Sequence, residues 1–514
     1  MHQRITPTAT MIMSCLVATG LIGVAACGPP PSPEGNSTAG AEAATLTVAE
    51  TTAPSTLDPQ ASGLFADRFA WQLSYECLMY TTPEGSVEPA LASEYRVSED
   101  GLTYSFTLRE GVAFSNGDSL DADDVVYTFQ RLKKSPGRYD KELFPTWEGV
   151  SKTGDMTVEF TLDSPDAGFI YNMGNPLVWG CAIMSESAQD ANLDTEMIGT
   201  GPWVQTEYKT DTQLTLERNS DYWGEGTKAQ ELSVLYMPSM STQIGALNAG
   251  EVDIIFPDQG SVEGLQENGF TVDQVETDST VFLQVNDSKE PFSDPAARRA
   301  LALSIDRQAL ADLAYGESAR PSSYLPPSLA WAPEIDSLTN HQYDSEQAKQ
   351  ILQAAGYTES VPLELIYISG YDPGTNDLVA TLQSQMNEAG FDVTLKPMEA
   401  AAWSEMKNNA RHQLSWNAQS YYPNPYQYVA PVPGRQGPVP EELQKEIDKA
   451  RAATSEEEYH QALTEVAEKE AELVYPTLTL LATDMFVAYH DGVSGVAVPP
   501  SESRTFLTDV SLQG

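Results

Sequence analysis

Two short stretches of alternating apolar and polar residues constrain the fold more than any other feature of this sequence. They cover residues 102–108 and 156–162, and both place an apolar side chain at every second position. A period of two puts these side chains on one face of a β-strand, so two half-buried strands are predicted. Apolar runs predict further strands at residues 45–48, 213–217, 232–237, 252–256, 280–286, 362–368 and 391–396.

Helical patterns are interleaved with these strands. Asp294 is followed by Pro295, a combination typical of a helix start. A second helix is predicted after Ser345, and Ser455 with Glu458 forms a capping-box pattern for a third. Strands and helices that alternate over 514 residues predict an α/β protein with several packed layers.

The segment between the two alternating strands contains a hydrolase-like motif. Residues 117–120 read Gly-Asp-Ser-Leu, which is associated with a family of serine hydrolases. Such an enzyme also needs an aspartate three residues before a histidine, and none of the five histidines has one. Asp121 is a good N-cap, and the acids that follow it suit the positive end of a helix dipole. We interpret the motif as a helix start and keep a secreted hydrolase as the least favoured alternative.

The first 26 residues have the features of a secretory leader. They contain Arg4 but no acid, and the mostly apolar run 11–26 is short for a bilayer span. The run ends in Val-Ala-Ala before Cys27, which resembles the bacterial lipobox and implies cleavage there and lipidation of Cys27. An uncleaved anchor and ordinary secretion are the alternatives. Residues 27–44 are predicted to be a flexible tether, so the protein is expected on the outer face of the cytoplasmic membrane.

Charge and cysteine content limit the partners and the compartment. The formal net charge is -46, so nucleic acid, which needs a basic surface, is not expected as a partner. After removal of the leader and lipidation of Cys27, two cysteines remain, Cys77 and Cys181. Outside the cytoplasm disulfides persist, so these two form a disulfide or are two buried free thiols.

Five blocks of sequence, in a fixed order, resemble one family. The longest block is EPALASEYRVSEDGLTYSFTLREGVAFSNGDSLDADDVVYTFQR at 88–131, preceded by YECLMY at 75–80. The other blocks are IGTGPW with LERNSDYW (198–203 and 216–223), ALNAGEVDI (246–254), the run 285–307 and the run 343–357. Together they resemble the extracytoplasmic solute-binding proteins of peptide/nickel-type ABC transporters, the oligopeptide- and dipeptide-binding cluster of family 5.

The resemblance implies a two-lobed periplasmic-binding-protein fold of class II. An extra subdomain is added to the first lobe, and the ligand lies in a cleft between lobes joined by hinge crossovers. The expected boundaries are 1–26 for the signal peptide, 27–44 for the tether, 45–85 with 197–283 and 488–514 for lobe one, 86–196 for the extra subdomain and 284–487 for lobe two.

The resemblance also implies a function in binding, in which no bond is broken. The closed form would deliver a small solute to the permease subunits of an ABC importer. A monomer is expected, with no cofactor, no metal and no enzymatic activity. A receptor that hands its ligand to a signalling protein, or a chaperone, is the alternative within the binding class.

One stretch departs from the family pattern. In the family's peptide binders, an aspartate between a Trp and a Tyr-Pro-Asp-Pro motif pairs with the ligand's α-amine. Here residues 416–425 read Trp-Asn-Ala-Gln-Ser-Tyr-Tyr-Pro-Asn-Pro, so Gln419 or Tyr421 takes the place of the acid. An oligopeptide-like solute stays the leading prediction, and an N-blocked or non-peptide solute (oligosaccharide, opine or metal chelate) is the alternative. The candidate ligand-binding residues are Trp416, Gln419, Tyr421, Tyr422 and Asn424, unless this is a purely structural loop.

Three further candidates are weaker. The resemblance places a ligand loop of the first lobe at Ser62, Leu64 and Phe65. Trp403 is expected either in the cleft or in the core. His412 is a lone histidine beside an arginine, and it is expected at the surface rather than in a nickel site.

Overall fold

The computed structural model of the chain describes residues 45–61, 65–82, 86–134, 144–174, 179–369, 374–420, 439–500 and 504–513. These residues belong to one compact unit that begins at Ala43. The expected leader, the expected lipidation site Cys27 and the expected tether lie outside the described residues. Within the described ranges, no helix combines the length and the apolar character that crossing a membrane requires.

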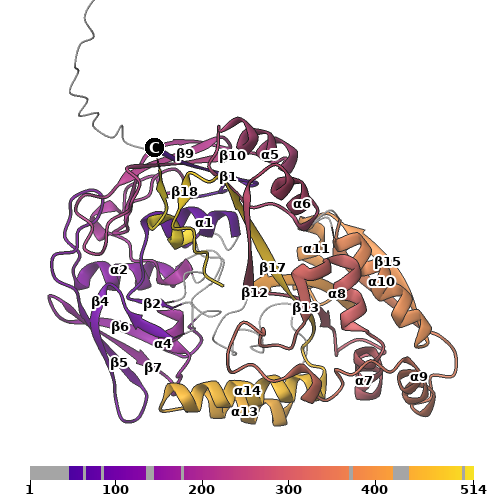
Figure 1. The fold of residues 1–514 in the computed structure, drawn as a ribbon. Coiled ribbons are helices and arrows are strands. Elements are labelled where there is room, and N and C mark those ends of the chain that lie inside the picture. Colours follow the sequence, from indigo (N-terminus) through magenta and orange to yellow (C-terminus); the bar gives the residue numbers. More distant parts are fainter. Residues whose placement is uncertain are drawn as a thin grey trace, which may run out of the picture. The chain divides into compact units, whose positions relative to one another are not determined.

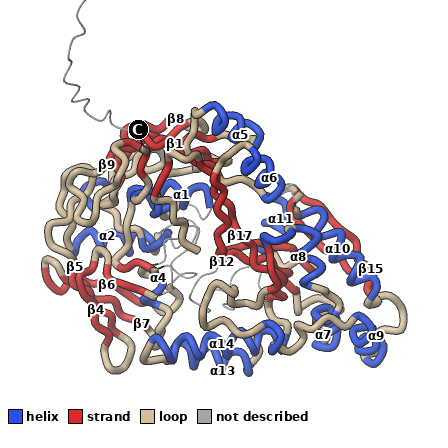
Figure 2. Tube along the Cα trace, in the orientation of Figure 1, coloured by secondary structure: helices blue, strands red, loops and turns tan. Residues whose placement is uncertain are grey.

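The main β-sheet of the described residues has 11 strands and extends through two cores (Figures 1 and 2). Ten strands follow the order β15-β14-β16-β12-β17-β11-β1-β10-β9-β8, and β13 pairs with β17 beside this path. The first lobe contributes β1 (Thr45–Glu50), β8 (Trp203–Lys209), β9 (Gln213–Arg218), β10 (Glu231–Tyr236), β11 (Ile254–Ile255), α1 (Phe65–Ser74), α5 (Met240–Ala249) and α6 (Gln259–Glu267), with a small β18 (Val493–Ser494) and β19 (Ser511–Leu512) pair.

The second lobe covers its part of the sheet with helices. Its strands are β13 (Ala319–Pro321), β14 (Val361–Ile368), β15 (Phe391–Met398) and β16 (Leu414–Ser420). Its helices are α7 (Pro295–Leu303), α8 (Arg307–Ala314), α9 (Ser345–Ala354), α10 (Thr375–Glu388), α11 (Ala400–Asn408), α13 (Glu441–Arg451) and α14 (Glu456–Leu473).

Two long strands, β12 (Thr271–Val285) and β17 (Thr477–Tyr489), belong to both lobes (Figure 1). Val281 and Leu283 of β12 lie in the core of the second lobe, whereas Val275 of the same strand packs against that of the first. In β17, Leu480 lies in the second core and Val487 in the first. The chain therefore passes between the lobes within the two strands of one antiparallel ladder.

The extra subdomain is a four-stranded antiparallel sheet covered by α2 (Ala122–Leu132). Its strands, in the order β4-β5-β7-β6, are β4 (Ala92–Val97), β5 (Thr103–Leu108), β7 (Thr157–Leu162) and β6 (Trp147–Gly154). Phe129 of α2 is fully buried, with ring centroids 4.7 Å from Phe160 and 5.3 Å from Trp147. Aromatic side chains therefore fill the space between helix and sheet. The short α4 (Phe169–Asn172) and the β2 (Met79–Thr81) and β3 (Val87–Pro89) hairpin lie beside this core.

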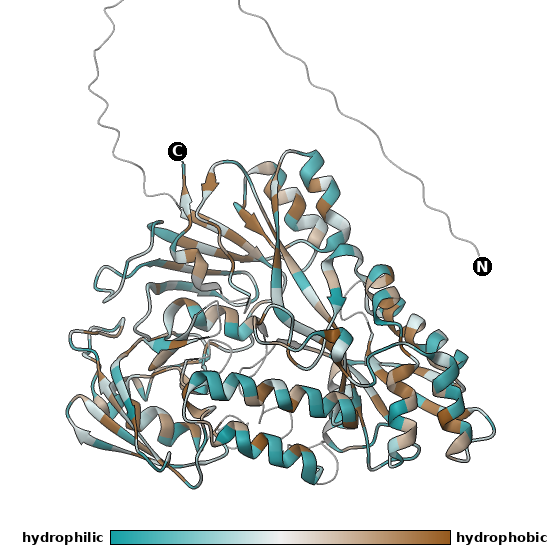
Figure 3. Ribbon diagram, turned by 60° about the horizontal axis from the view of Figure 1, so that its bottom comes forward, coloured by the Kyte–Doolittle hydropathy of each residue, from teal (hydrophilic) through white to brown (hydrophobic). Residues whose placement is uncertain are grey.

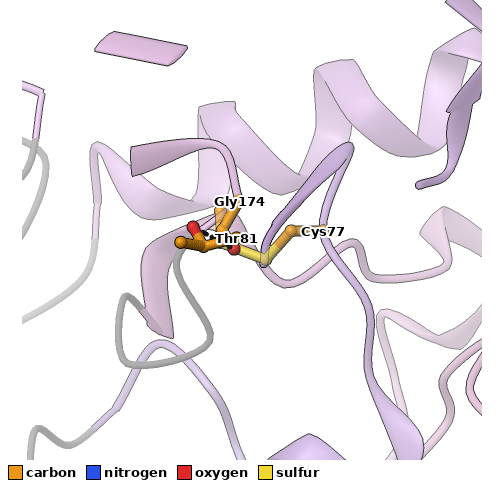
Figure 4. The surroundings of a disulfide bond; sticks show 4 residues. Cys77, Thr81 and Gly174 are labelled. Carbon is orange, nitrogen blue, oxygen red and sulfur yellow. Dashed lines mark hydrogen bonds between the residues drawn. A yellow bond between two sulfur atoms is a disulfide. The ribbon is translucent and has the colours of Figure 1, made fainter. Parts of the chain in front are cut away.

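Cys77 and Cys181 form a disulfide with a Cα–Cα distance of 5.2 Å (Figure 4). Close by, Gly174 O accepts hydrogen bonds from Thr81 N at 2.9 Å and from Thr81 Oγ1 at 3.1 Å. A Cβ on Gly174 would lie 2.9 Å from the backbone nitrogen of Tyr80, so only glycine fits this approach. These contacts attach the β2–β3 hairpin to the subdomain.

The local predictions are largely confirmed. Both alternating segments are strands, and Asp121 caps α2, with Asp121 N donating to the Asp124 carboxylate at 3.0 Å in a capping box. Asp294 caps α7 ahead of Pro295. The expected start of α9 is shifted, because its cap is Asp344, which accepts from Gln347 N at 2.8 Å.

Candidate ligand-binding region

The ladder between β12 and β17 is interrupted where the strands leave one core for the other. Glu276 pairs with Asp484 and Thr280 pairs with Ala482, so residues 277–279 bulge out of register. Thr277 Oγ1 donates to Thr483 O at 2.6 Å, which holds the bulge against β17. A bulge bends and twists a strand, so this point is suited to a change of direction between the lobes.

Asp278, in the middle of the bulge, contacts segments of both lobes. Its backbone N–H donates to Pro500 O at 2.9 Å, in the C-terminal segment of the first lobe. Its carboxylate accepts from Ser328 Oγ at 2.8 Å, in a loop of the second lobe. The bulge is thus fixed by hydrogen bonds from both sides.

An ionic cluster lies next to the bulge. Arg320 of β13 pairs with Asp484 of β17 and, at 3.3 Å, with Glu276 of β12. Gln274 Nε2 also donates to Asp484 at 2.7 Å. The Asp484 side chain is only 4% exposed, so its charge depends on these partners, whereas that of Glu276 is 67% exposed.

The segment that leads into the predicted first-lobe ligand loop is attached to α2. Arg131 Nη1 donates to Asp58 Oδ1 at 3.0 Å and to Gln60 Oε1 at 2.9 Å, and Gln60 Nε2 donates to Thr128 O at 3.0 Å. Helix α2, which begins after the Gly-Asp-Ser-Leu motif, therefore helps to position this segment of the first lobe. Of the predicted loop, Ser62 and Leu64 lie outside the described residues, and Phe65 begins α1.

The structure describes only part of the predicted second-lobe site. Trp416, on β16, is 1% exposed and belongs to the hydrophobic core of the second lobe. Gln419 pairs with Thr280 of β12, next to the bulge. Tyr421, Tyr422 and Asn424 lie outside the described residues. Contact of these residues with a ligand stays a prediction. In this structure Trp416 is buried, and its side chain packs β16 onto the core of the second lobe.

Trp403 is half-buried on α11, one turn before Lys407, whose Nζ lies 4.3 Å from the ring centroid. This cation–π contact covers part of the ring. Its role as a cleft residue stays a prediction.

The expectation that His412 lies at the surface is wrong. The side chain is fully buried, and this burial, assisted by the charge of Lys407, lowers its pKa to about 4. His412 is therefore neutral at pH 7. Among the described residues there is no group of three or more metal-ligating side chains.

Sequence reasoning missed a partly buried carboxylate, Glu76. It accepts hydrogen bonds from Thr200 Oγ1 at 2.8 Å, Tyr222 OH at 2.9 Å and Trp223 Nε1 at 3.0 Å. Burial raises the pKa of Glu76, and the three donors and the nearby Arg109 oppose that shift. Arg109 also lies 4.2 Å above the Trp223 ring. Residues from four segments, which belong to the first two of the five sequence blocks that carry the family resemblance, therefore meet around Glu76.

Comparisons with known proteins agree with this architecture. The family model described as "Bacterial extracellular solute-binding proteins, family 5 Middle" matches residues 86–437. Di/tripeptide-binding protein 2 of Pseudomonas aeruginosa is 29% identical over 512 residues, covering 91% of this chain and 94% of the relative. The nickel-binding periplasmic protein of Escherichia coli is 28% identical, covering 77% of this chain and 81% of the relative.

A solved structure shows the same fold. The periplasmic binding protein DppA of Helicobacter pylori, in complex with the peptide STSA, superimposes with a TM-score of 0.78 at 22% identity. The likeness covers 92% of this chain and 98% of that one. The predicted two-lobed periplasmic-binding-protein fold is confirmed.

Proposed function

Because the chain belongs to the bacterial extracellular solute-binding proteins of family 5, we propose that it captures an oligopeptide-like solute between its lobes and delivers it to the permease of an ABC importer. The observation that carries this proposal is the β12–β17 ladder, which joins two separate cores and is interrupted by a hydrogen-bonded bulge at 277–279. A two-strand connection of this kind suits rotation of one lobe against the other around a ligand.

Peptide binding is supported by the di/tripeptide-binding relative, whose length the match covers almost completely. The nickel-binding relative is the reason to keep a metal chelate as an alternative solute. Family members are binding proteins, so solute capture without turnover is the proposed activity. In this proposal Cys27 carries the lipid anchor, and the monomeric protein works on the outer face of the cytoplasmic membrane.

We propose that residues at the end of β16 determine how the amino end of the ligand is bound. The acid of the family's peptide binders is replaced by Gln419 or Tyr421, and an uncharged side chain cannot offer an ammonium a charge-assisted bond. The ligand is therefore a solute with a blocked or uncharged end, unless a neighbouring acid takes over. Asp278 is the acid to test, because it precedes Ser279, which pairs with Ser420 of β16.

The experiment is thermal unfolding of residues 28–514 with a panel of di- to octapeptides, their N-acetylated forms, oligosaccharides, opines and nickel chelates. A ligand that binds the folded state raises the midpoint by mass action. Stabilisation by acetylated peptides or sugars supports an uncharged site. If only free-amine peptides stabilise and Asp278→Asn abolishes the effect, Asp278 is the replacement acid. If no member of the panel stabilises the protein, the proposal of an oligopeptide-like solute is contradicted.

A further inference from the structure

A groove lies on the first-lobe side of the bulge, between the β12–β17 ladder and the chain segment that follows β18 (Figure 1). Its volume is about 390 Å³, which falls within the range of pockets that hold small organic molecules. None of the predicted ligand-binding residues is among the described residues that line it. The lining includes Asp273, Val275 and Glu276 of β12, Val487 of β17, and Val496 and Val498 of the segment after β18.

The apolar part of this lining belongs to the core of the first lobe. Val487 is fully buried in that core, and Val275, Val496 and Val498 are partly buried against it. Along β12 these apolar side chains alternate with hydrophilic ones, so both kinds of residue are mixed on the strands (Figure 3). A ligand with an apolar stem is attracted here, because it removes the exposed valine methyl groups from water.

The wall formed by residues 496–500 is held at both of its ends. Gly495 turns the chain with a φ of 82°, and a Cβ at this position would collide with the backbone oxygen of Asp509, so only glycine fits. At the other end, Pro500 O accepts a hydrogen bond from Asp278 N at 2.9 Å. Tertiary contacts therefore fix the shape of the groove.

The rim of the groove is acidic. Tyr489 OH donates to Asp273 Oδ2 at 2.7 Å, and burial, assisted by this carboxylate, raises the pKa of Tyr489 to about 12. The hydroxyl thus stays protonated at neutral pH and holds the carboxylate in place. Glu276, whose side chain is 67% exposed, lies 3.3 Å from Arg320 Nη2, and the same guanidinium pairs with the almost fully buried Asp484. Three carboxylates therefore accompany one guanidinium, and negative charge is in excess beside the valines.

We propose that this groove binds a small linear alkylammonium ion, with its apolar stem against the valines and its ammonium group at Asp273 and Glu276. Carboxylates on the rim attract a cation and repel an anion, and the valines favour an unbranched hydrocarbon over a hydrated inorganic ion. Every described lining residue lies on the first-lobe side of the bulge. The site therefore needs no closure of the lobes and is independent of the solute proposed above.

The test is methyl NMR of residues 28–514 with carbon-13-labelled valine methyl groups, titrated with n-hexylamine at pH 7. The signals of Val275, Val487, Val496 and Val498, assigned by single substitutions such as Val496→Ala, should shift and saturate. The control n-hexanol has the same stem without the charge and should bind at the same valines about fivefold more weakly, as expected for loss of an exposed ion pair. Hexanoate, with the opposite charge, should leave these signals unchanged.

Charge-removing variants locate the ammonium group. Asp273→Asn keeps an oxygen for the Tyr489 hydroxyl but removes the charge, so hexylamine should lose most of its advantage over hexanol. Asp392→Asn is the matched control, because Asp392 is an exposed acid on β15 of the second lobe, and the advantage should remain. If Asp273→Asn does not fold, as judged by the dispersion of its valine signals, Glu276→Gln at an exposed side chain decides in its place.

Three results overturn the proposal. These are equal affinities for hexylamine and hexanol in the parent protein, signal shifts that spare the four valines, and an advantage of the amine that survives both Asp273→Asn and Glu276→Gln. No peptide or other transported solute is present in this experiment, so a failure of solute capture leaves its outcome unaffected.

Discussion

The Arg131 guanidinium donates to both carboxylate oxygens of Asp58, with Nη1 3.0 Å from Oδ1, and so ties α2 of the extra subdomain to the first-lobe segment before the predicted ligand loop. The side chains are 28% and 12% exposed, so this pair is largely withdrawn from water. Through this ion pair, helix α2, which follows the Gly-Asp-Ser-Leu motif, fixes the position of a first-lobe segment.

Arg131→Met should lower the free energy of unfolding by about 2 kcal/mol, because the Asp58 carboxylate keeps its burial and loses its partner. Urea unfolding followed by circular dichroism measures the change. The matched control is Arg96→Met, which removes an exposed pair with Glu94 at 3.6 Å and should cost less than about 0.5 kcal/mol. Equal losses in the two variants contradict the positioning role.

Ser119→Ala should leave both stability and ligand-induced stabilisation unchanged. Ser119 is exposed and precedes the α2 cap residue Asp121 by two positions. Thermal unfolding with and without the best ligand of the panel checks this. A loss of hydrolytic turnover of that ligand in Ser119→Ala would revive the hydrolase interpretation.

Glu76→Gln should destabilise the protein by about 1–3 kcal/mol, because an amide nitrogen would face one of the donors that now bind the carboxylate. The loss should depend on pH. Burial raises the pKa of Glu76 above 4.5, so folding favours the protonated carboxyl. The contribution of Glu76 to the free energy of unfolding is therefore largest at low pH, and it is lost as pH rises through the raised pKa. The wild type should therefore lead the variant by more at pH 4.5 than at pH 8. A difference that is constant with pH contradicts this assignment.

Replacing both Cys77 and Cys181 by serine should lower the free energy of unfolding by about 4 kcal/mol, since the disulfide closes a loop of 104 residues in the unfolded chain. Thermal unfolding with and without reductant measures it. The wild type should lose stability on reduction, and the double variant should not respond. A reductant-insensitive wild type would mean that the bond contributes no stability.

Local structure could be predicted from the sequence where a pattern of neighbouring residues determines it. The period of two in β5 and β7 and the cap at Asp121 depend on neighbouring residues alone. Strand β17 was missed, because most of TLTLLATDMFVAY is buried on both faces and so does not alternate. Only the second half of β12 was predicted, since its first half is largely half-exposed and charged.

The candidate site was predictable only in outline. The family resemblance indicated the region of β16, but the burial of Trp416 and His412 depends on packing from distant segments. The Glu76 node combines partners that lie 124 to 147 positions away, and no local pattern links them.

The most direct test of solute capture is small-angle X-ray scattering of residues 28–514 with and without the solute that most raises the unfolding midpoint. Closure about the β12–β17 ladder predicts that the bound protein remains a monomer with a smaller radius of gyration, and that the solute is recovered unchanged. An unchanged radius at saturating solute, or conversion of the solute to a product, would contradict capture between closing lobes.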